Sequence, residues 1–501
     1  MLNPRNVVVI LLDSLGRHHV GAYGGREFDT PQLDHFARGA IQFLSHHTGA
    51  LPCIPARHDL WCGVWDFLWR PWGSIELWDE SLPALLREQG IITKLVSDHP
   101  HLFESGGENY HVDFTAWEYL RGHEGDPWRT RADPSWQGAP NFGRGRLPYD
   151  NSRGWFRGEE DFPGPRTMAE AARWLKEEAP SDGRFFLLVD EFDPHEPFDT
   201  PEPWASRYDP DWEGPPLVWP PYCRDGVARG VLTPRQVVQL RAQYGAKLSM
   251  IDHWLGKVLV ALEERGRAGD TAVVVMTDHG LYLGEHDLFG KPAAPLYAPL
   301  THMPLLIRWP GLPPRSVDAL TTTVDLYATL LDWFGVAVPR LTHGRSLLPL
   351  LRGEATSHHP WILTGVWGRE VGLVTPEWRY TRAPVGENHP LSIWSNRWST
   401  MPIGRPRHVA MPPPDARARL QFAPGSTIPV ITQRLEKQDL VPYWARVTFR
   451  GNHLYQWRED PGEGVNRVGS SDEGSLVEML EAALAEVQAP PEQAERLGLS
   501  W

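Results

Sequence analysis

The sequence predicts an α/β fold in which a large, mixed but mostly parallel β-sheet is sandwiched by helices. Two observations support this fold class. Short runs of valine, isoleucine and leucine alternate with segments of helical periodicity as far as about residue 355, and such alternation is typical of parallel sheets covered on both faces. From residue 356 the pattern changes to short segments that predict antiparallel strands. We therefore expect a large domain over residues 1–355 and a smaller α+β domain, built on an antiparallel sheet, over residues 356–501.

The elements of the first domain follow one another in a regular order. Each expected strand is a short apolar run, and these runs span residues 6–12, 91–97, 184–192, 271–277 and 303–310. The helices carry apolar residues at helical spacing; some open on a capping residue and Pro, as at Thr30-Pro31, or close on Gly, as at Gly90. They are expected over residues 30–43, 54–64, 80–90, 167–178, 233–265 and 322–335.

Two long segments, residues 103–165 and 193–232, interrupt this pattern and are rich in Gly, Pro and Trp. Loops of this length are usually functional or lid-like. In the C-terminal domain we expect antiparallel strands within residues 361–367, 370–382 and 444–457, and a closing helix over 473–488.

The charge and cysteine content exclude several classes of protein. Lys and Arg number 49 against 63 Asp and Glu, which gives a net charge of −14. An acidic chain repels nucleic acid and anionic membranes, so an anionic substrate must be attracted by a local cluster of positive groups. The apolar run at residues 7–12 is too short to span a membrane and lacks the features of a secretion signal. Three cysteines cannot form a disulfide framework, and we expect a cytoplasmic protein.

Polar side chains follow four of the predicted strands. In such sheets, ligands bind beyond the carboxyl ends of the strands, so these groups point to a single site. They are Asp13-Ser14, the segment from Ser97 to His101, Asp193-Pro194-His195, and Asp278-His279-Gly280.

Asp13, Asp278 and His279 provide two carboxylates and one imidazole. A carboxylate-rich site with one nitrogen ligand suits Ca²⁺, Mg²⁺ or Mn²⁺ better than Zn²⁺. Lys291 and His195 add positive groups nearby, and Arg57 adds a planar fork that can bind an oxyanion.

The segment Cys53-Ile54-Pro55-Ala56-Arg57 resembles the Cys-x-Pro-x-Arg modification signature of the sulfatases, in the alkaline-phosphatase superfamily. Five further segments resemble landmarks of that family in the same order along the chain. They are NVVVILLDSLG, TPQLDHFARGAIQF, TDHGLYLGEHDLFGKPAAPLY, HMPLLIRWPG and LYQWREDPGEGVNRVG. The resemblance therefore covers almost the whole chain.

The resemblance implies a hydrolase of sulfate esters that acts on a small anionic ester. In sulfatases a formylglycine-generating enzyme oxidises the cysteine to an aldehyde, which at position 53 would be the hydrated nucleophile. Arg57 would orient this group, and Lys291 and His195 would bind the sulfuryl oxygens, one of them protonating the leaving group. The implied ligands of one divalent cation, Ca²⁺ or Mn²⁺, are Asp13, the modified Cys53, Asp278 and His279.

The chain also departs from the usual sulfatase pattern. Many sulfatases have Asp-Asp where this chain has Asp13-Ser14, and Asp-Asn where it has Asp278-His279. A family Lys after the third strand is missing, and either His99 or His101 takes the place of the neighbouring family His. Phosphonate monoester hydrolases and phosphodiesterases share the first two departures and are usually linked with Mn²⁺. A phosphodiesterase or phosphonate monoester hydrolase with the same machinery is therefore the alternative function.

Other interpretations predict different outcomes. Cys53 could be an inert buried thiol or could form a disulfide with Cys62. A binding or scaffold protein with a decayed site would have lost at least one of the motif residues, and none is lost. Homo-oligomers are common for such enzymes, and the C-terminal strands could offer an edge for pairing. We expect structural roles for Cys62, Cys223, His18, His19, His46, His47, His302 and Lys94. For His302, which stands just before a strand, a role at the rim of the site stays open.

Overall fold

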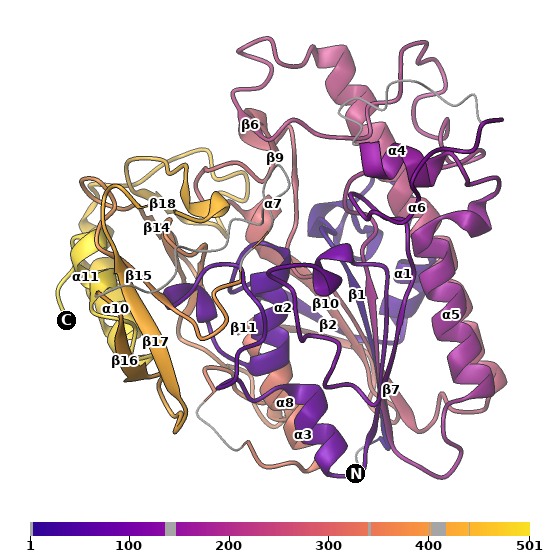
Figure 1. The fold of residues 1–501 in the computed structure, drawn as a ribbon, viewed down its shortest axis with the longest axis horizontal. Helices are drawn as coiled ribbons and strands as arrows, with labels where there is room; N and C mark the ends of the chain where they lie inside the picture. The colour runs from indigo at the N-terminus through magenta and orange to yellow at the C-terminus, as the bar shows by residue number, and fades with distance from the viewer. Residues whose placement is uncertain (1–3, 136–146, 339–341, 400, 402–416, 440) are drawn as a thin grey trace.

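The computed structural model describes residues 4–135, 147–338, 342–399, 401, 417–439 and 441–501. Its centre is an eight-stranded sheet in the order β11-β2-β10-β7-β1-β5-β3-β4 (Figure 1). All neighbouring strands are parallel except β10, which is antiparallel to both β2 and β7. This mixed sheet confirms the predicted fold class. The strands are β1 (Asn6–Leu12), β2 (Ile41–His47), β3 (Ile92–Ser97), β4 (Ala116–Tyr119), β5 (Phe185–Glu191), β7 (Thr271–Met276), β10 (His302–Arg308) and β11 (Arg315–Thr322).

Helices cover both faces of this sheet, as Figure 1 shows. Alternate residues of β1 point to opposite faces: Val8 and Ile10 pack in the cluster with α1, α5 and α6, whereas Val7 and Val9 pack in the cluster with α2, α3 and α8. Burial on both sides explains why β1, β5 and β7 are continuous apolar runs. The helices are α1 (Pro31–Arg38), α2 (Cys53–Cys62), α3 (Leu82–Glu88), α4 (Leu147–Arg153), α5 (Pro163–Glu177), α6 (Pro234–Glu264), α7 (Ala298–Thr301), α8 (Val324–Phe334) and α9 (Leu348–Arg352).

The structure corrects one predicted helix. The segment 30–43 does not form a single helix, because α1 ends at Arg38 and Ile41–His47 forms β2. Gly39 caps α1, and the buried Ile41 and Phe43 then alternate with half-buried neighbours, which is the period of a strand. The strand β11, which pairs with β2, was not predicted either.

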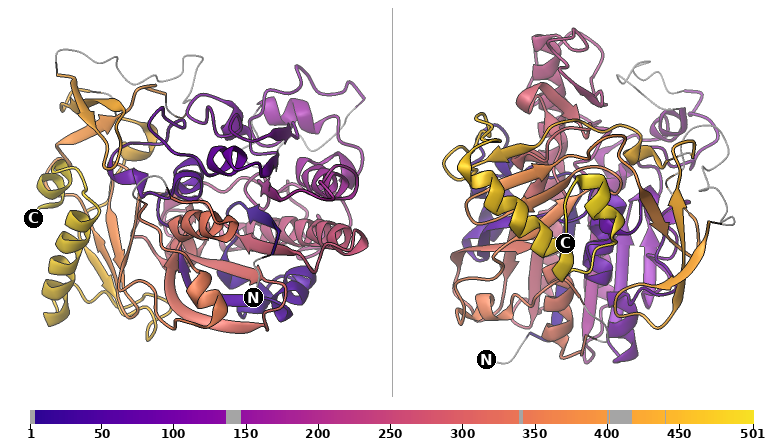
Figure 2. Two further views of the ribbon diagram at one scale, coloured as in Figure 1. Left: turned by 90° about the horizontal axis from the view of Figure 1, so that it is seen from below. Right: turned by 90° about the vertical axis from the view of Figure 1, so that its left-hand side faces the viewer.

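The C-terminal part contains two antiparallel sheets and two helices. In the right panel of Figure 2 these elements lie in front of the central sheet. Trp65 and Trp69, which follow α2 in the chain, pack in one core cluster with Leu363 and Leu373 of this part. The boundary between residues 355 and 356 stays a prediction. The elements are β12 (Ile362–Gly365), β13 (Val371–Val374), β14 (Arg379–Arg382) and β18 (His453–Tyr455) in one sheet, β15 (Leu391–Trp394), β17 (Pro429–Leu435) and β16 (Arg419–Phe422) in the other, α10 (Ser471–Glu486) and α11 (Glu492–Leu497).

The predicted strand over 444–457 is much shorter than expected, since only His453–Tyr455 is extended and paired. A 3-10 helix, η7 (Tyr443–Ala445), stands at the start of that segment. The other 3-10 helices are η1 (Arg17–His19), η2 (Gly21–Tyr23), η3 (Asp66–Leu68), η4 (Pro100–Phe103), η5 (Glu159–Asp161) and η6 (Glu285–Asp287).

The two long loops are only partly irregular. The first contains β4 and α4, and its residues 136–146 lie outside the described part of the chain. The second contributes one strand, β6 (Cys223–Arg224), to a small three-stranded sheet whose other strands, β9 (Leu288–Gly290) and β8 (Tyr282–Leu283), follow β7 in the chain.

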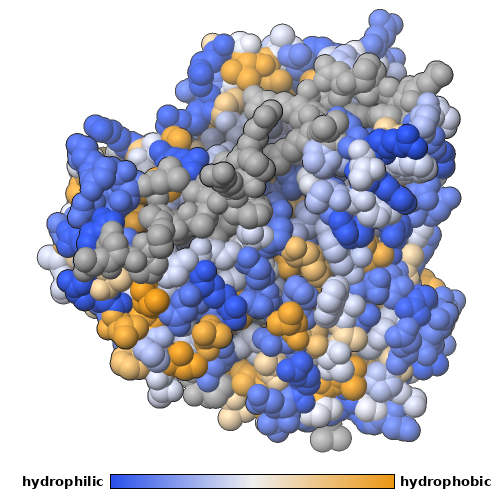
Figure 3. Space-filling model, viewed as in Figure 1, coloured by the Kyte–Doolittle hydropathy of each residue, from blue (hydrophilic) through white to orange (hydrophobic). Residues whose placement is uncertain are grey.

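The surface shown in Figure 3 carries its apolar side chains in small separate patches among hydrophilic ones. Among the described residues, no helix is both long and apolar enough to cross a membrane.

Candidate active site

The carboxyl ends of β1 and β7 and the start of α2 meet at one edge of the central sheet. Asp13 directly follows β1, Asp278 and His279 follow β7, and Cys53 is the first residue of α2. One ligand atom from each of these four side chains lies within 4.8 Å of all the others. All four residues are buried, so the sheet gathers the predicted metal ligands in one enclosed place.

The thiol of Cys53 lies in the middle of this group. Its Sγ is 3.3 Å from Nε2 of His279, 3.5 Å from Nζ of Lys291 and 3.9 Å from Oδ1 of Asp13. Burial, with the negative charge of Asp13, raises the pKa of Cys53 well above its ordinary value. The thiolate is the reactive form of cysteine, so the unmodified side chain is a poor nucleophile here.

Arg57 lies one helical turn after Cys53, and its buried guanidinium joins three carboxylates. Nη1 is 2.8 Å from Asp278 and 3.0 Å from Asp13, while Nε and Nη2 bind Asp190 in a fork at 2.9 and 2.6 Å. Burial raises the pKa of Asp13, but Arg57, His279 and Lys291 lower it by more, and the pKa falls well below its usual range. The carboxylate of Asp13 therefore stays ionised inside the protein.

Asp190 was not among the predicted site residues. It is the sixth residue of β5 and lies within a strand that is buried throughout. Asp190 and Glu191 end a strand that is otherwise apolar, and these carboxylates were the signal, because such groups are rarely buried without a charged partner.

The donor set fits a divalent cation. The buried Oδ2 of Asp13 accepts no hydrogen bond within the described structure. Nδ1 of His279 lies 2.9 Å from the carbonyl oxygen of Gly280. If this nitrogen carries the proton, the lone pair of Nε2 faces Cys53, the arrangement usual for a metal-ligating imidazole. Burial also lowers the pKa of His279 and favours the neutral form that a metal ligand needs.

Lys291 closes the other side of the group. Its Nζ lies 3.4 Å from Oγ of Ser14 and 3.5 Å from Sγ of Cys53. Burial lowers the pKa of Lys291, but the charges of Cys53, Glu196 and Asp13 raise it by more, and the ammonium stays charged. The lysine thus places a cation beside the reactive position.

The three predicted histidines lie around the ring of Phe192, at centroid distances of 4.1 Å for His99, 5.9 Å for His101 and 4.2 Å for His195. Of these three histidines, only His99 contacts a carboxylate among the predicted metal ligands: its Nε2 lies 3.5 Å from Oδ2 of Asp13. Neither ring nitrogen of the buried His99 has a hydrogen-bond partner among the described residues.

His101 and His195 are held differently. His101 lies between Glu104 and Glu124, with Nε2 3.1 Å from the carboxylate of Glu124. His195 pairs through Nδ1 with the carbonyl oxygen of Glu196 at 2.8 Å, and burial followed by the charge of Lys291 lowers its pKa. The charge of Lys291 therefore affects the pKa of His195. His101 instead forms separate ion pairs with Glu104 and Glu124.

Several other groups have contacts of a structural kind. The rings of His47 and His302 stack at 4.5 Å, and His302 binds the carbonyl oxygen of Leu44. No disulfide joins Cys53 and Cys62, so the pairing that remained open from the sequence is not formed.

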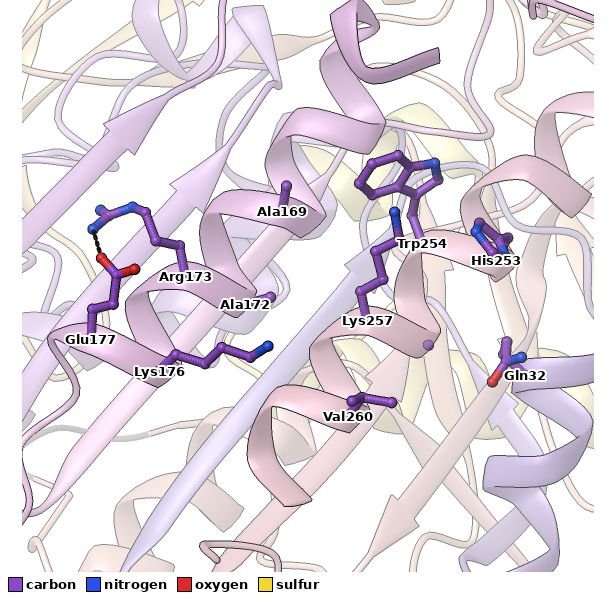
Figure 4. A pocket seen from close by; sticks show the side chains of 11 residues that line it. Gln32, Ala169, Ala172, Arg173, Lys176, Glu177, His253, Trp254, Lys257 and Val260 are labelled. Atoms are coloured by element: carbon purple, nitrogen blue, oxygen red, sulfur yellow. Dashed lines mark hydrogen bonds and ion pairs between the residues drawn. The ribbon is translucent and has the colours of Figure 1, made fainter. Parts of the chain in front are cut away.

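Two cavities help to locate a substrate. A groove of about 650 Å³ between α5 and α6 is lined by Lys176, Trp254 and Lys257 among others (Figure 4) and contains none of the predicted site residues. A second cavity, of about 520 Å³, has Lys291 in its wall, and Nζ of this lysine lies 3.5 Å from Sγ of Cys53. Lys291 therefore links the cavity to the candidate site, although Cys53 itself does not line the cavity. We call it the Lys291 cavity.

Comparisons with known proteins agree with this fold and site. The family model "Sulfatase" matches residues 5–336. Arylsulfatase K of Bos taurus is 24% identical over 421 residues, which cover 75% of this chain and 73% of the relative. The "Multifunctional alkaline phosphatase superfamily protein PehA" of Trinickia caryophylli is 26% identical over 403 residues, 70% of this chain and 77% of its own length.

Solved structures give the same fold. The phosphonate monoester hydrolase of Agrobacterium radiobacter superposes with a TM-score of 0.63 at 17% identity, over 97% of this chain and 95% of its own. A 2-O GAG sulfatase superposes with a TM-score of 0.61 at 18% identity, over 97% and 93%. The family model spans the central sheet and every predicted metal ligand, and it confirms the resemblance found in the sequence. The chain belongs to the sulfatase family and is a hydrolase of that family.

Proposed function

We propose that this protein hydrolyses sulfate esters of small anionic substrates, with Cys53 converted to formylglycine as the nucleophile. The observation that carries the proposal is the position of Cys53: its side chain lies within 3.9 Å of Asp13, His279 and Lys291, all in one buried group. A structural cysteine has no need of two ionised neighbours of opposite sign. The family model and the arylsulfatase K relatives support the same reaction.

Asp13, Asp278, His279 and position 53 would hold one divalent cation, which, when bound, neutralises anionic oxygens and acidifies a coordinated hydroxyl. A hydrated aldehyde at position 53 would supply a hydroxyl for attack on sulfur and a second one for release of the product. Arg57 is fixed by Asp190 and holds the start of α2 through the carbonyl oxygen of Cys53 at 3.2 Å.

The remaining polar groups would act on the ester. The charged Lys291 would bind a sulfuryl oxygen beside Cys53. His99 would be a second contact, since its two ring nitrogens are unpartnered and it lies next to Asp13. The leaving alkoxide needs a proton, which the charged Lys291 would deliver. His195 is neutral and lies near Lys291, so it would accept the proton that the second hydroxyl at position 53 loses on release of the product. His101 is held by two carboxylates and would position His99 rather than touch the substrate.

A second candidate keeps the same machinery but acts on phosphonate monoesters or phosphodiesters. Two observations favour it. Ser14 stands where many sulfatases have a second Asp, so one carboxylate ligand is lost, and its hydroxyl donates to Asp13 at 2.7 Å. His279 stands where many have Asn, so an imidazole nitrogen would replace an amide oxygen among the ligands of the cation. The metal would be Mn²⁺ under this second candidate and Ca²⁺ under the first.

The two candidates are separated by comparing kcat/KM for an aryl sulfate, an aryl phosphodiester and an aryl phenylphosphonate, each with Ca²⁺ and with Mn²⁺. We expect the sulfate to be hydrolysed fastest. If the sulfate is slower than the other two by orders of magnitude, the second candidate replaces the first.

Cys53→Ala tests the nucleophile in both cases. We expect loss of all three activities by at least about a thousandfold, because covalent catalysis ends. Cys62→Ala, at the other end of α2, is the matched control and should keep its activity. Activity that survives in Cys53→Ala would require a different nucleophile.

Mass spectrometry of the peptide that contains Cys53 tests the modification directly. Conversion of the thiol to the aldehyde lowers the mass by about 18 Da. The proposal includes a formylglycine-generating enzyme as maturation partner and a cytoplasmic location, the latter supported by the low cysteine content of the chain. A peptide that is wholly unmodified in the native host would contradict the formylglycine mechanism.

A further inference from the structure

The Lys291 cavity has a strongly basic wall. Five of its residues are cationic, and none of the described residues that line it is Asp or Glu. The chain as a whole has the opposite balance, with 49 Lys and Arg against 63 Asp and Glu. The cationic residues are Lys291, Arg224, Arg229, Arg369 and Arg446.

Two of these charges are already engaged. Lys291 contacts Ser14 and Cys53, so the proposed reaction uses it for the ester that is cleaved. Arg369 is buried and forms an ion pair with the buried Glu370 at 2.7 Å. Neither Lys291 nor Arg369 is therefore available to bind a second anionic group of the substrate.

The other three charges have no such partner. Arg224, Arg229 and Arg446 are exposed, and within the described part of the chain none of them has a carboxylate at ion-pair distance. The polar contacts of Arg229 and Arg446 are to backbone oxygens, those of Arg224 and Val441 respectively. A cavity lined by one sign of charge attracts ions of the opposite sign.

The fold brings these arginines to the reactive end of the molecule. In the small sheet, Arg224 of β6 pairs with Leu288 of β9, and β9 leads directly into Lys291. Arg446 comes from the C-terminal part, where it follows η7. The cavity therefore forms where two distant segments of the chain meet.

Aromatic rings complete the wall. Tyr222, Tyr443 and Trp444 line the cavity, with the centroid of Tyr222 6.3 Å and that of Tyr443 5.2 Å from the ring of Trp444. Such rings offer flat faces on which a ring-shaped leaving group can pack. Glu196 does not line the cavity; it is buried and accepts the hydroxyl hydrogen bond of Tyr222.

We propose that the Lys291 cavity binds the leaving alcohol of the substrate and that Arg224, Arg229 and Arg446 recognise a second anionic group on that alcohol. The group is a carboxylate or a second sulfate, since guanidinium groups bind both. The substrate is thus at least a dianion, with its cleaved ester at Lys291 and its second charge at the arginines. This inference rests on the proposed function for the orientation of the substrate.

The test uses three aryl sulfates with a flexible chain of two to four carbons on the ring, far from the ester. The chain ends in a carboxylate, in a sulfonate that stands in for a second sulfate, or in an uncharged carboxamide. The spacer keeps the leaving phenol electronically the same, so differences in kcat/KM report binding of the chain end. We expect the charged probes to exceed the carboxamide by at least about tenfold, a difference of about 1.4 kcal/mol.

The triple variant Arg224→Gln, Arg229→Gln and Arg446→Gln should bring that ratio close to one. A matched triple variant of exposed arginines outside the cavity, Arg26→Gln, Arg87→Gln and Arg265→Gln, should keep the wild-type ratio. Preference for the carboxylate over the sulfonate, or the reverse, identifies the second anion. An unchanged ratio in the cavity variant would overturn the inference.

Calorimetric binding of the same probes to Cys53→Ala separates this inference from the proposed reaction. We expect the charged probes to bind Cys53→Ala more tightly than the neutral probe does, and this difference to be lost when the cavity arginines are also replaced. That result supports the subsite even if the wild type hydrolyses none of the probes. In that case only the proposed function fails. Equal dissociation constants for the charged and neutral probes would overturn the subsite, whatever the turnover.

Discussion

Asp190 is the residue that fixes Arg57, and through Arg57 the start of α2. The fork of hydrogen bonds between them is fully buried. Removal of one partner from a buried ion pair leaves an uncompensated charge and is strongly destabilising. Here Asp13 and Asp278 still face Arg57 at 3.0 and 2.8 Å, so part of the compensation remains.

We therefore predict that Asp190→Asn lowers the free energy of unfolding by about 2–4 kcal/mol and lowers kcat/KM as well. Urea unfolding and steady-state kinetics measure the two effects. Glu170→Gln is the matched control, because it makes the same change in the partner of the exposed Arg173. A surface pair of that kind contributes at most about 1 kcal/mol. Equal losses in both variants would show that Asp190 has no special role.

At this scale the sequence allowed most of the site to be predicted, because the residues concerned stand at strand ends or in the cysteine signature. The structure gathers those residues: Asp13, Cys53, Arg57, Asp278, His279 and Lys291. The choice between His99 and His101 needed spatial contacts, since both follow the same strand. Asp190 was missed because strand periodicity does not reveal which partner faces a buried carboxylate.

At the scale of elements, the turn after β7 depends on a close backbone contact at Gly280. A Cβ atom at this position would lie 1.9 Å from the carbonyl oxygen of Pro299 in α7. The amide of Gly280 donates to the carbonyl of Leu300 at 3.0 Å, and its own carbonyl oxygen lies 2.9 Å from Nδ1 of His279. The absence of a side chain thus lets α7 pack against the turn that carries Asp278 and His279.

We predict that Gly280→Ala displaces this turn and lowers kcat/KM by at least tenfold, with a loss of stability of about 1–3 kcal/mol from overpacking. Kinetics and thermal unfolding measure both effects. Gly269→Ala is the control, because a Cβ there would meet no atom within 4 Å. Normal activity in Gly280→Ala would mean that α7 can move away without disturbing His279.

The order of elements could be predicted well, but their boundaries and the outer strands could not. The five predicted strands of the first domain all form, because their long apolar runs are buried on both faces. β2 and β11 were missed because they lie away from the centre of the sheet and carry polar residues. Only two residues separate α1 from β2, so the apolar residues of β2 continued the helical spacing of α1 and were predicted as part of the same helix.

At the scale of the whole molecule, His101 links stability to pH. Burial lowers the pKa of His101, but Glu104 and Glu124 raise it by more, to about 10. The pKa of the folded state is therefore above the ordinary value of about 6.5 for an unfolded chain. The resulting stabilisation is fully present below about pH 6.5 and is lost as the pH rises through about 10.

We predict that His101→Gln lowers the free energy of unfolding by about 3 kcal/mol at pH 6, a figure reduced for the solvent exposure of Glu104. The difference from the wild type should shrink steadily toward pH 10. Denaturant unfolding at several pH values measures this difference. His35→Gln on the exposed side of α1 is the control. A difference that does not change with pH would show that His101 stabilises the fold by packing alone.

The proposed metal also couples to the stability of the whole molecule. A cation that binds only the folded state stabilises it by mass action, by about 2.7 kcal/mol at one hundred times its dissociation constant. The buried carboxylates of Asp13 and Asp278 and the imidazole of His279 provide the ligands for it. We therefore predict that Mn²⁺ or Ca²⁺ raises the melting temperature, that EDTA reverses the rise, and that Asp278→Asn abolishes it.

A second cluster in the described part of the chain, Asp325 with His358 and His359, provides the control. The carboxylate of Asp325 already accepts hydrogen bonds from the amides of Thr322 and Arg345, and His359 lies 2.7 Å from it, so its oxygens are engaged in holding the start of α8. Asp325→Asn should therefore lower the melting temperature in the absence of metal but keep the rise on metal addition. If the rise survives in Asp278→Asn and is lost in Asp325→Asn, the cation binds at the second cluster and Cys53 lacks its metal.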